Sequence, residues 1–211
     1  MCILGDMRQE ADYYRRAWTE SDGKCARAMR SLGRWHFYRQ EYRESVDCFN
    51  KSFEINKLRA DDWFTCGCAY MRLEELDKAI FAFGTVVSID EQQAEAWGNI
   101  SNCYAVQEKY KEALACTEQA LKFNRRHWRI WQNCIRFCIS TKKLYKAMNC
   151  VRELLRNDQF EGLNGGLLLK LTEIYLANFT EQSGMPKKEA LRHKAQIFRF
   201  FKDWTNSIND Y

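Results

Sequence analysis

Residues 63–70 read WFTCGCAY, residues 97–104 read WGNISNCY and residues 131–138 read WQNCIRFC. Each stretch starts with a tryptophan, and the three tryptophans are 34 residues apart. A fixed period of this length is typical of an array of similar structural units, and four in-phase blocks argue against coincidence. The aligned blocks are 26–59, 60–93, 94–127 and 128–161.

Within each block, apolar and small residues follow the spacing of one face of a helix, first in one segment and then in a second. We therefore expect two helices per block. The first helices should span about 27–39, 61–73, 95–107 and 129–141, and the second about 42–56, 76–89, 110–123 and 144–157. The expected repeat core is Leu32, Gly33, Trp63, Gly67, Tyr70, Ala79, Phe83, Trp97, Ile100, Tyr104, Ala113, Ala120, Trp131 and Ala147.

The columns resemble the tetratricopeptide-repeat pattern W-x2-L-G-x2-Y…A-x3-F. One helix pair cannot bury its apolar face alone, so the pairs must stack. The prediction is an all-α, right-handed superhelix (an α-solenoid) of antiparallel helix pairs with a 34-residue period. The sequence departs from the pattern at the closing proline column, which holds Lys57, Glu91, Arg125 and Gln159.

Both ends of the array are irregular. Residues 1–25 are expected to be the remnant of a preceding repeat, with 8–20 as its second helix. Residues 162–211 are expected to form an irregular helical pair, at 163–180 and 187–205, with the last helix as a cap. We expect the array to be cut at both ends, which would make this chain a fragment of a longer protein.

Some stretches resemble one family more closely. Residues 63–70, residues 94–104 (AEAWGNISNCY) and residues 119–134 (QALKFNRRHWRIWQNC) are similar to the tetratricopeptide repeat protein 27 family, and the resemblance covers roughly residues 4–160. Members of that family are longer eukaryotic proteins. The resemblance implies a non-enzymatic scaffold for protein–protein interaction that serves the assembly or maturation of large RNA–protein complexes.

Composition sets limits on location and cofactors. The chain carries a modest formal charge of +5, and no apolar run approaches the roughly 20 residues of a membrane span. The N-terminal residues do not resemble a secretory signal, so we expect a cytoplasmic or nuclear protein without disulfides. The ten cysteines lack zinc-ribbon spacing and several recur in repeat columns, which indicates packing positions. We expect no metal and no cofactor.

Catalysis requires converging groups, and the sequence does not offer them. None of His36, His127 and His193 has a cysteine or carboxylate at local ligand or triad spacing. The acidic pairs 61–62 and 74–75 are expected at helix ends, facing solvent or the helix dipole. We therefore expect no enzyme activity and no small-molecule substrate.

Residues of the first helices that lie off the packing stripe should line a binding groove. Arginines suit carboxylate capture, and five of them fall in the first and fourth blocks, around an apolar and mildly acidic middle. The expected partner is a protein or peptide with acidic flanks and an apolar centre. The candidate groove residues are Arg27, Arg30, Arg34, Phe64, Met71, Asn102, Arg129, Gln132 and Arg136.

Three other uses stay open. The basic and aromatic run at 125–131 suits direct RNA binding, although its tryptophans are equally suited to a core. Apolar ends of a truncated array suit self-association. Repeats of this class also capture chaperone C-termini through a carboxylate clamp of lysines, asparagines and an arginine. No window of this sequence completes that set, because Gly98 and Glu95 stand at clamp positions, so we expect weak binding or none.

Overall fold

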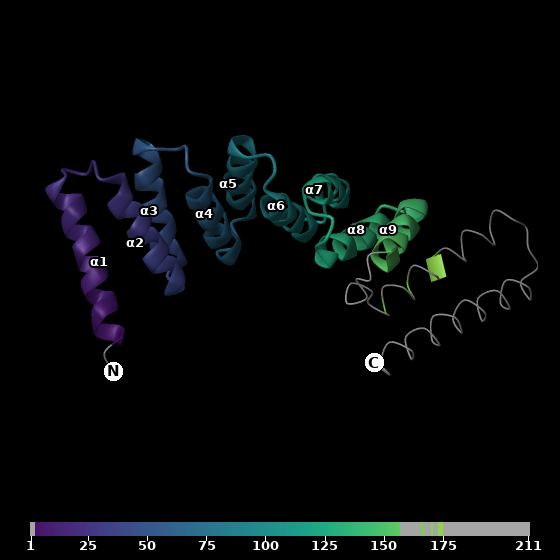
Figure 1. Ribbon diagram of the computed structural model, residues 1–211, viewed down its shortest axis with the longest axis horizontal. Helices are drawn as coiled ribbons and strands as arrows, with labels where there is room; N and C mark the ends of the chain where they lie inside the picture. The colour runs from purple at the N-terminus through teal and green to yellow at the C-terminus, as the bar shows by residue number, and fades with distance from the viewer. Residues whose placement is uncertain (1–2, 157–165, 167–169, 171–172, 175–211) are drawn as a thin grey trace, which may run out of the picture. The chain divides into compact units, whose positions relative to one another are not determined.

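The computed structural model describes residues 3–156, 166, 170 and 173–174 (Figure 1). The chain divides into two compact units, Met1–Phe123 and Asn124–Tyr211, and each is described by itself. Every regular element in the described residues is a helix, which confirms the predicted all-α fold. The first unit holds α1 (Ile3–Glu20), α2 (Ala26–Tyr38), α3 (Tyr42–Ile55), α4 (Ala60–Arg72), α5 (Leu76–Ile89), α6 (Ala94–Val106) and α7 (Tyr110–Phe123), and the second holds α8 (Trp128–Ser140) and α9 (Leu144–Arg156).

The helices pack as consecutive pairs. α2 packs on α3, α4 on α5 and α6 on α7 in the first unit, and α8 packs on α9 in the second. The first helix of each pair begins and ends one residue before its predicted bounds, and the second helices match theirs within one residue. Within the first unit, α3 also packs on α4 and α5 on α6, so that the pairs stack into one array (Figure 1).

The first helix of each pair ends just before a residue in the left-handed backbone conformation. Gln40, Glu74, Glu108 and Lys142 have φ angles of 64°, 60°, 58° and 58°, and they are 34 residues apart. The following residue donates its N–H to a carbonyl five residues back, for example Glu75 to Tyr70 at 3.0 Å. This is the hydrogen-bonded stop that commonly ends helices, here without the usual glycine.

The repeated tryptophans fix the connectors that enter each pair. The indole N–H of Trp63 donates to the Lys57 carbonyl at 2.9 Å, and Trp97 and Trp131 bond in the same way to Glu91 at 2.9 Å and Arg125 at 2.7 Å. These carbonyls belong to the column where the repeat pattern has proline. A hydrogen bond from the tryptophan therefore holds the connector that a proline would otherwise stiffen.

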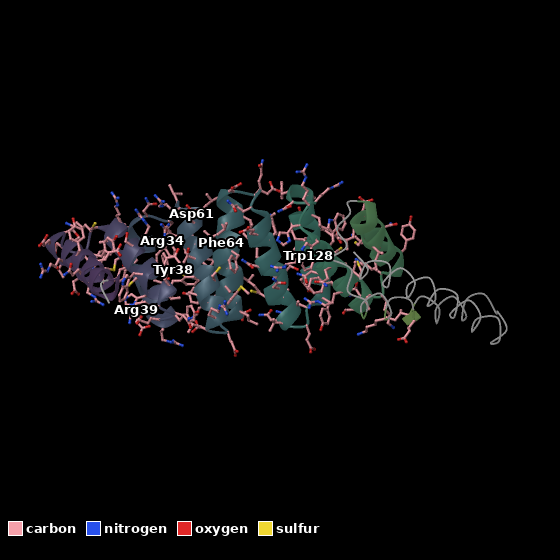
Figure 2. All side chains as sticks on the ribbon, turned by 60° about the horizontal axis from the view of Figure 1, so that its bottom comes forward. Arg34, Tyr38, Arg39, Asp61, Phe64 and Trp128 are labelled. Atoms are coloured by element: carbon pink, nitrogen blue, oxygen red, sulfur yellow. The ribbon has the colours of Figure 1, made fainter. Side chains whose placement is uncertain are left out.

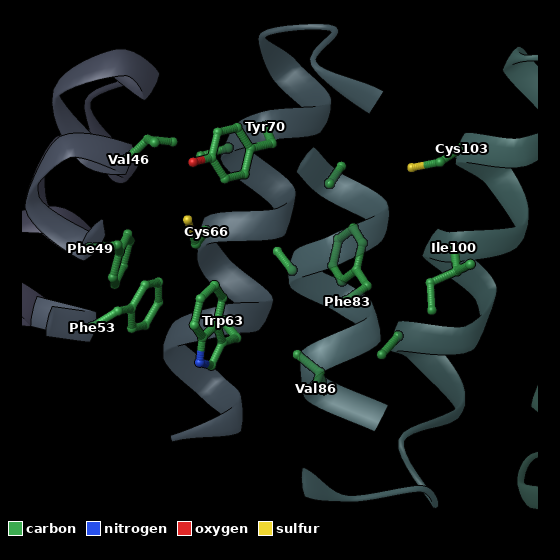
Figure 3. Packing of buried hydrophobic residues seen from close by; sticks show 14 residues of the cluster. Val46, Phe49, Phe53, Trp63, Cys66, Tyr70, Phe83, Val86, Ile100 and Cys103 are labelled. Atoms are coloured by element: carbon green, nitrogen blue, oxygen red, sulfur yellow. The ribbon is translucent and has the colours of Figure 1, made fainter. Parts of the chain in front are cut away.

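Aromatic side chains fill the centre of the first unit (Figure 3). The Trp63 ring stacks on Phe53, with ring centroids 3.6 Å apart, and thereby joins α3 to α4. Phe49 and Phe83 are fully buried. Of the predicted repeat-core residues, Trp97 and Tyr104 are partly exposed and the others are buried. A smaller cluster, Ala11, Met29, Leu32 and Cys48, packs α1 onto the array.

α1 is longer than the helix predicted at 8–20, and it packs on α2. The turn that follows it contains Gly23 at a φ of +72°, beside the Trp18 ring. The helices expected at 163–180 and 187–205, with His193 and the capping role of the last helix, fall outside the described residues apart from 166, 170, 173 and 174. No helix in the described part of the chain is long and apolar enough to cross a membrane.

Candidate functional site

The outward side chains of α2, α4 and α6 form one surface of the first unit, which we call the first-helix face. α2 contacts α4, and a shared cavity joins α4 to α6. Figure 2 shows Arg34 and Tyr38 from α2 near Asp61 and Phe64 from α4. The exposed or half-buried residues of this face include Arg27, Arg34, Tyr38, Asp61, Phe64, Thr65, Met71, Arg72, Glu95, Asn102 and Val106.

Two of the predicted groove arginines already hold a carboxylate of the chain itself. Arg34 Nη2 lies 2.7 Å from Asp62 Oδ1, and Arg30 Nε lies 3.2 Å from Asp62 Oδ2. Arg59 Nε approaches the same oxygen, Oδ2, at 3.3 Å. Asp62 lies in the first turn of α4, as the helix-dipole expectation requires, but the alternative that it faces solvent was wrong, because its side chain is fully buried between these arginines.

The arginine cluster therefore differs from an open anion site. Its Asp62 carboxylate neutralises part of the charge, and the Arg30 side chain is only 17% exposed. Arg27, which is exposed, and Arg34, whose side chain is 40% exposed, remain accessible to a partner. The basic part of the first-helix face is thus smaller than the sequence suggested.

A cavity of about 260 Å³ lies between α4 and α6 on this face. Its apolar wall includes Phe64 and Val86, and the Phe64 ring is held edge-on against Phe83 with centroids 5.4 Å apart. Its lining also includes the acidic residues Asp61 and Glu95, both exposed. The complete lining is Ala60, Asp61, Phe64, Thr65, Val86, Gln93 and Glu95.

Sequence reasoning missed one column of this face. Tyr38, Arg72 and Val106 are the last residues of α2, α4 and α6, are 34 residues apart and are all exposed. Tyr38 is 78% exposed and Val106 is 70% exposed, so both offer apolar surface to a partner. The repeat period itself could have found them, because Arg72 directly follows the predicted groove residue Met71, and Tyr38 and Val106 lie one period before and after Arg72.

The fourth block supplies the second unit's candidates. Arg129 and Arg136 on α8 are exposed, and Gln132 is half-buried. The Arg129 guanidinium lies over the Trp128 ring, 5.2 Å from its centroid, and Arg136 donates to Asn133 at 3.2 Å. Trp131 is buried, so within the run at 125–131 only Trp128 is a partly accessible tryptophan.

A second cavity, of about 310 Å³, lies between α1 and α2 and is lined by Ala11, Asp12, Arg15, Trp35 and Arg39. Arg39 covers the Trp35 ring at 4.7 Å and also donates to Glu41 at 2.8 Å.

His36 Nδ1 donates to the same carboxylate, that of Glu41, at 2.7 Å. The expectation that His36 has no carboxylate partner was therefore wrong. The hydrogen bond from Arg39 makes the largest contribution to lowering the pKa of Glu41, and the hydrogen bond from His36 makes the next largest.

The cysteines lie mostly inside the helix pairs. Burial raises the pKa of the Cys66 thiol to about 12 and those of Cys48 and Cys103 to about 11. In the second unit Cys150 Sγ lies 3.2 Å from Cys134 Sγ across the α8–α9 pair. Such thiols behave as small apolar groups. Among the described residues no group of three or more histidine, cysteine and acidic side chains is arranged to hold a metal.

Models of the tetratricopeptide repeat match residues 63–93 and 94–127, which carry α4–α5 and α6–α7. Two tetratricopeptide repeats therefore occupy residues 63–127. This family is generally a non-enzymatic protein-interaction module. The matched residues include five of the seven that line the α4–α6 cavity, and Ala60 and Asp61 lie just before them.

Curated relatives match over part of the chain. A TPR repeat-containing protein of Schizosaccharomyces pombe is 38% identical over 81 residues, which are 38% of this chain and 10% of the relative. The tetratricopeptide repeat protein 27 homolog of Dictyostelium discoideum is 36% identical over 74 residues, which are 35% of this chain and 9% of that protein. The matched segment is thus about a tenth of each relative's length.

Solved tetratricopeptide-repeat structures share the fold at low identity. YrrB, described as a protein with an unusual peptide-binding site, has a TM-score of 0.64 at 19% identity, over 73% of this chain and 79% of its own. The first tetratricopeptide-repeat domain of Spaghetti (RPAP3), bound to the HSP90 peptide SRMEEVD, has a TM-score of 0.52 at 17% identity, over 56% of this chain and 93% of that one.

Proposed function

We propose that this chain is a protein-interaction module that binds an extended segment of a partner protein on the first-helix face. The observation that carries the proposal is the exposure of Tyr38 and Val106, at 78% and 70%, on the face that also holds the α4–α6 cavity. Exposed apolar groups that share a face with a cavity and charged groups suit a protein partner. Two proteins of similar fold add support, because YrrB is described as having a peptide-binding site and the Spaghetti (RPAP3) domain was solved with a bound HSP90 peptide.

The finer chemistry of the partner is also a proposal. Arg27 and Arg34 supply accessible positive charge at α2, which supports acidic residues in the partner segment at that end. Phe64, Tyr38 and Val106 support apolar residues next to them. Two acidic flanks are less well supported, because Asp62 already occupies Arg30 and Arg34 in part.

The resemblance to the tetratricopeptide repeat protein 27 family supports a wider proposal. The chain would then act within a longer scaffold, in the cytoplasm or the nucleus, that assists the assembly of large RNA–protein complexes. The support is 36% identity over 74 residues to the Dictyostelium homolog, and it concerns about a tenth of that protein.

Direct RNA binding is the second candidate. The exposed side chains of Arg125, Arg126, His127 and Arg129 beside the partly exposed Trp128 favour it. Against it, the Trp128 face that a base would stack on already carries Arg129 at 5.2 Å. A mobility shift with single-stranded RNA that weakens steeply with salt would support this candidate, and no shift at low salt would remove it.

The test of the first proposal is a selection of randomised displayed peptides on the full chain, followed by fluorescence polarisation with the selected peptides. We expect Tyr38→Ser and Val106→Ser each to weaken binding about tenfold, because each removes an apolar contact of roughly 1.4 kcal/mol. Phe81→Ser is the matched control, since Phe81 is a 68% exposed aromatic residue on α5. Equal losses in all three variants would place the site elsewhere.

A further inference from the structure

We propose that the α4–α6 cavity receives a basic side chain, arginine or lysine, of the partner segment, and that acidic residues of the same segment lie over α2. This inference rests on the proposed function, because it names the partner chemistry at the first-helix face. It also differs from the sequence-based expectation, in which only acidic residues of the partner made charged contacts.

The acidic residues at the cavity have no basic partner among the described residues. Asp61 and Glu95 line it from α4 and α6, and both are exposed. Neither carboxylate forms a salt bridge with any residue that the structure describes. The adjacent Asp62 shows the contrast, because its carboxylate lies within 3.3 Å of three arginine side chains. The negative charge of the cavity is therefore available to a partner.

The cavity also has an apolar wall. Phe64 and Val86 line the same cavity, and the contact with Phe83 fixes the Phe64 ring. A lysine or arginine side chain combines an aliphatic stem, which packs on such a wall, with a charged end that interacts with carboxylates and with an aromatic face. A purely apolar side chain would leave both carboxylates without a partner.

The cavity has the size for one side chain, and a partner backbone can reach it. The volume of about 260 Å³ is slightly below the roughly 300–1,000 Å³ that is usual for small-molecule sites, so the cavity suits one side chain. Gly98 follows Glu95 by one helical turn on α6, and a Cβ added there would meet nothing within 4 Å. The backbone of a partner can thus approach α6 closely at this point.

The charges also set a direction for the segment. Arg27 and Arg34 present positive charge from α2, and Asp61 and Glu95 present negative charge from α4 and α6. A segment with an acidic residue over α2 and a basic residue in the cavity satisfies both ends, whereas the reverse orientation places like charges together. A nucleic-acid backbone carries only negative charge and does not fit the cavity.

The experiment pans a library of randomised displayed peptides on the full chain and on a double variant, Asp61→Asn with Glu95→Gln. The matched control is Asp47→Asn with Glu112→Gln, which removes two exposed carboxylates from α3 and α7. We expect wild type and control to select peptides with arginine or lysine at one position and aspartate or glutamate at a constant spacing. The double variant should lose the basic preference and bind the wild-type peptides about tenfold more weakly.

Replacing the basic residue of a selected peptide by alanine should cause a similar loss, and combining both changes should add little more. Peptides that lose affinity with Tyr38→Ser but carry no basic preference would overturn the inference and leave the proposed function standing. A double variant that keeps the basic preference would overturn the inference in the same way. If no peptide binds in a way that depends on Tyr38 or Val106, both the inference and the proposed function fail.

Discussion

The ring of Phe83 lies so close to Gly67 that a Cβ on the glycine would be 2.9 Å from it. The equivalent pair one repeat earlier is Gly33 and Phe49, at 3.1 Å. In the third repeat the two columns hold Ser101 and Thr117, whose hydroxyls lie 2.6 Å apart. The two columns thus face each other in each pair of the first unit, and a large residue in one requires a very small residue in the other.

Gly67→Ala should destabilise the chain, although alanine is the better helix former. The added methyl group forces the buried Phe83 ring to move, at a cost of about 1–3 kcal/mol. Gly98→Ala is the control, because its Cβ enters open space and should add about 0.5–1 kcal/mol of stability. Urea unfolding of both variants checks the pair. If both substitutions stabilise the chain, the Phe83 ring can move away from the added methyl group without a loss of folding free energy.

The fold could be predicted because these columns repeat. The tryptophan, small-residue and aromatic columns recur every 34 residues, and a helix pair must bury them whatever the surface carries. The left-handed column at Gln40, Glu74, Glu108 and Lys142 could not be predicted from residue type, because none of the four is glycine or asparagine. The packing of the two helices imposes that conformation on ordinary polar residues.

Trp63→Phe should cost about 1–3 kcal/mol. It removes the hydrogen bond from the indole to the Lys57 carbonyl and reduces the stacking on Phe53. That hydrogen bond restrains the connector between α3 and α4, which has no proline. Amide exchange in this connector should therefore also become faster. Trp128→Phe is the control, and its partly exposed ring should matter little. Equal changes in thermal unfolding for both would argue that the indole N–H adds nothing.

Asp62→Asn should destabilise the first unit by about 2–4 kcal/mol, because it leaves three arginines around a buried neutral group. Asp61→Asn is a close comparison, since the neighbouring carboxylate is exposed and forms no salt bridge within the described residues. Its effect on the free energy of unfolding should stay within about 0.5 kcal/mol. A small effect at both positions would mean that solvent replaces the ion pairs of Asp62.

The sequence places the candidate groove residues on the first helices, but it does not give the charge of that face. It identified Arg30, Arg34 and Phe64, because surface positions follow from the helical period. It could not foresee that Asp62, 28 residues after Arg34, is the buried partner of these arginines, since periodicity within one helix says nothing about ion pairs between helices. That pairing leaves Asp61 and Glu95 as the accessible negative charges of the α4–α6 cavity.

Cys48 and Cys66 should resist iodoacetamide in the folded chain at pH 8. Burial raises the pKa of these thiols to about 11 and about 12, so the reactive thiolate is scarce, and both side chains are shielded. Raising the pH towards 9 should still leave them mostly protonated, because the pH stays below both values. Peptide mass spectrometry after labelling gives the extent of modification, with Cys25, which is partly exposed, as the internal reference. Rapid labelling of Cys66 in the absence of denaturant would contradict its burial.

The chain should bind the peptide SRMEEVD at least tenfold more weakly than does the Spaghetti (RPAP3) domain that was solved with it. The clamp that holds such acidic C-termini needs basic residues along the face, whereas this chain presents Gly98 and Glu95 on α6 and Asp61 on α4. Fluorescence polarisation with the labelled peptide measures the affinity of both proteins. Glu95→Lys should reduce the difference between the two affinities. Tight binding by the wild-type chain that Asn102→Ala abolishes would show that the face accepts carboxylates after all, and it would contradict the direction that we assign to the partner segment.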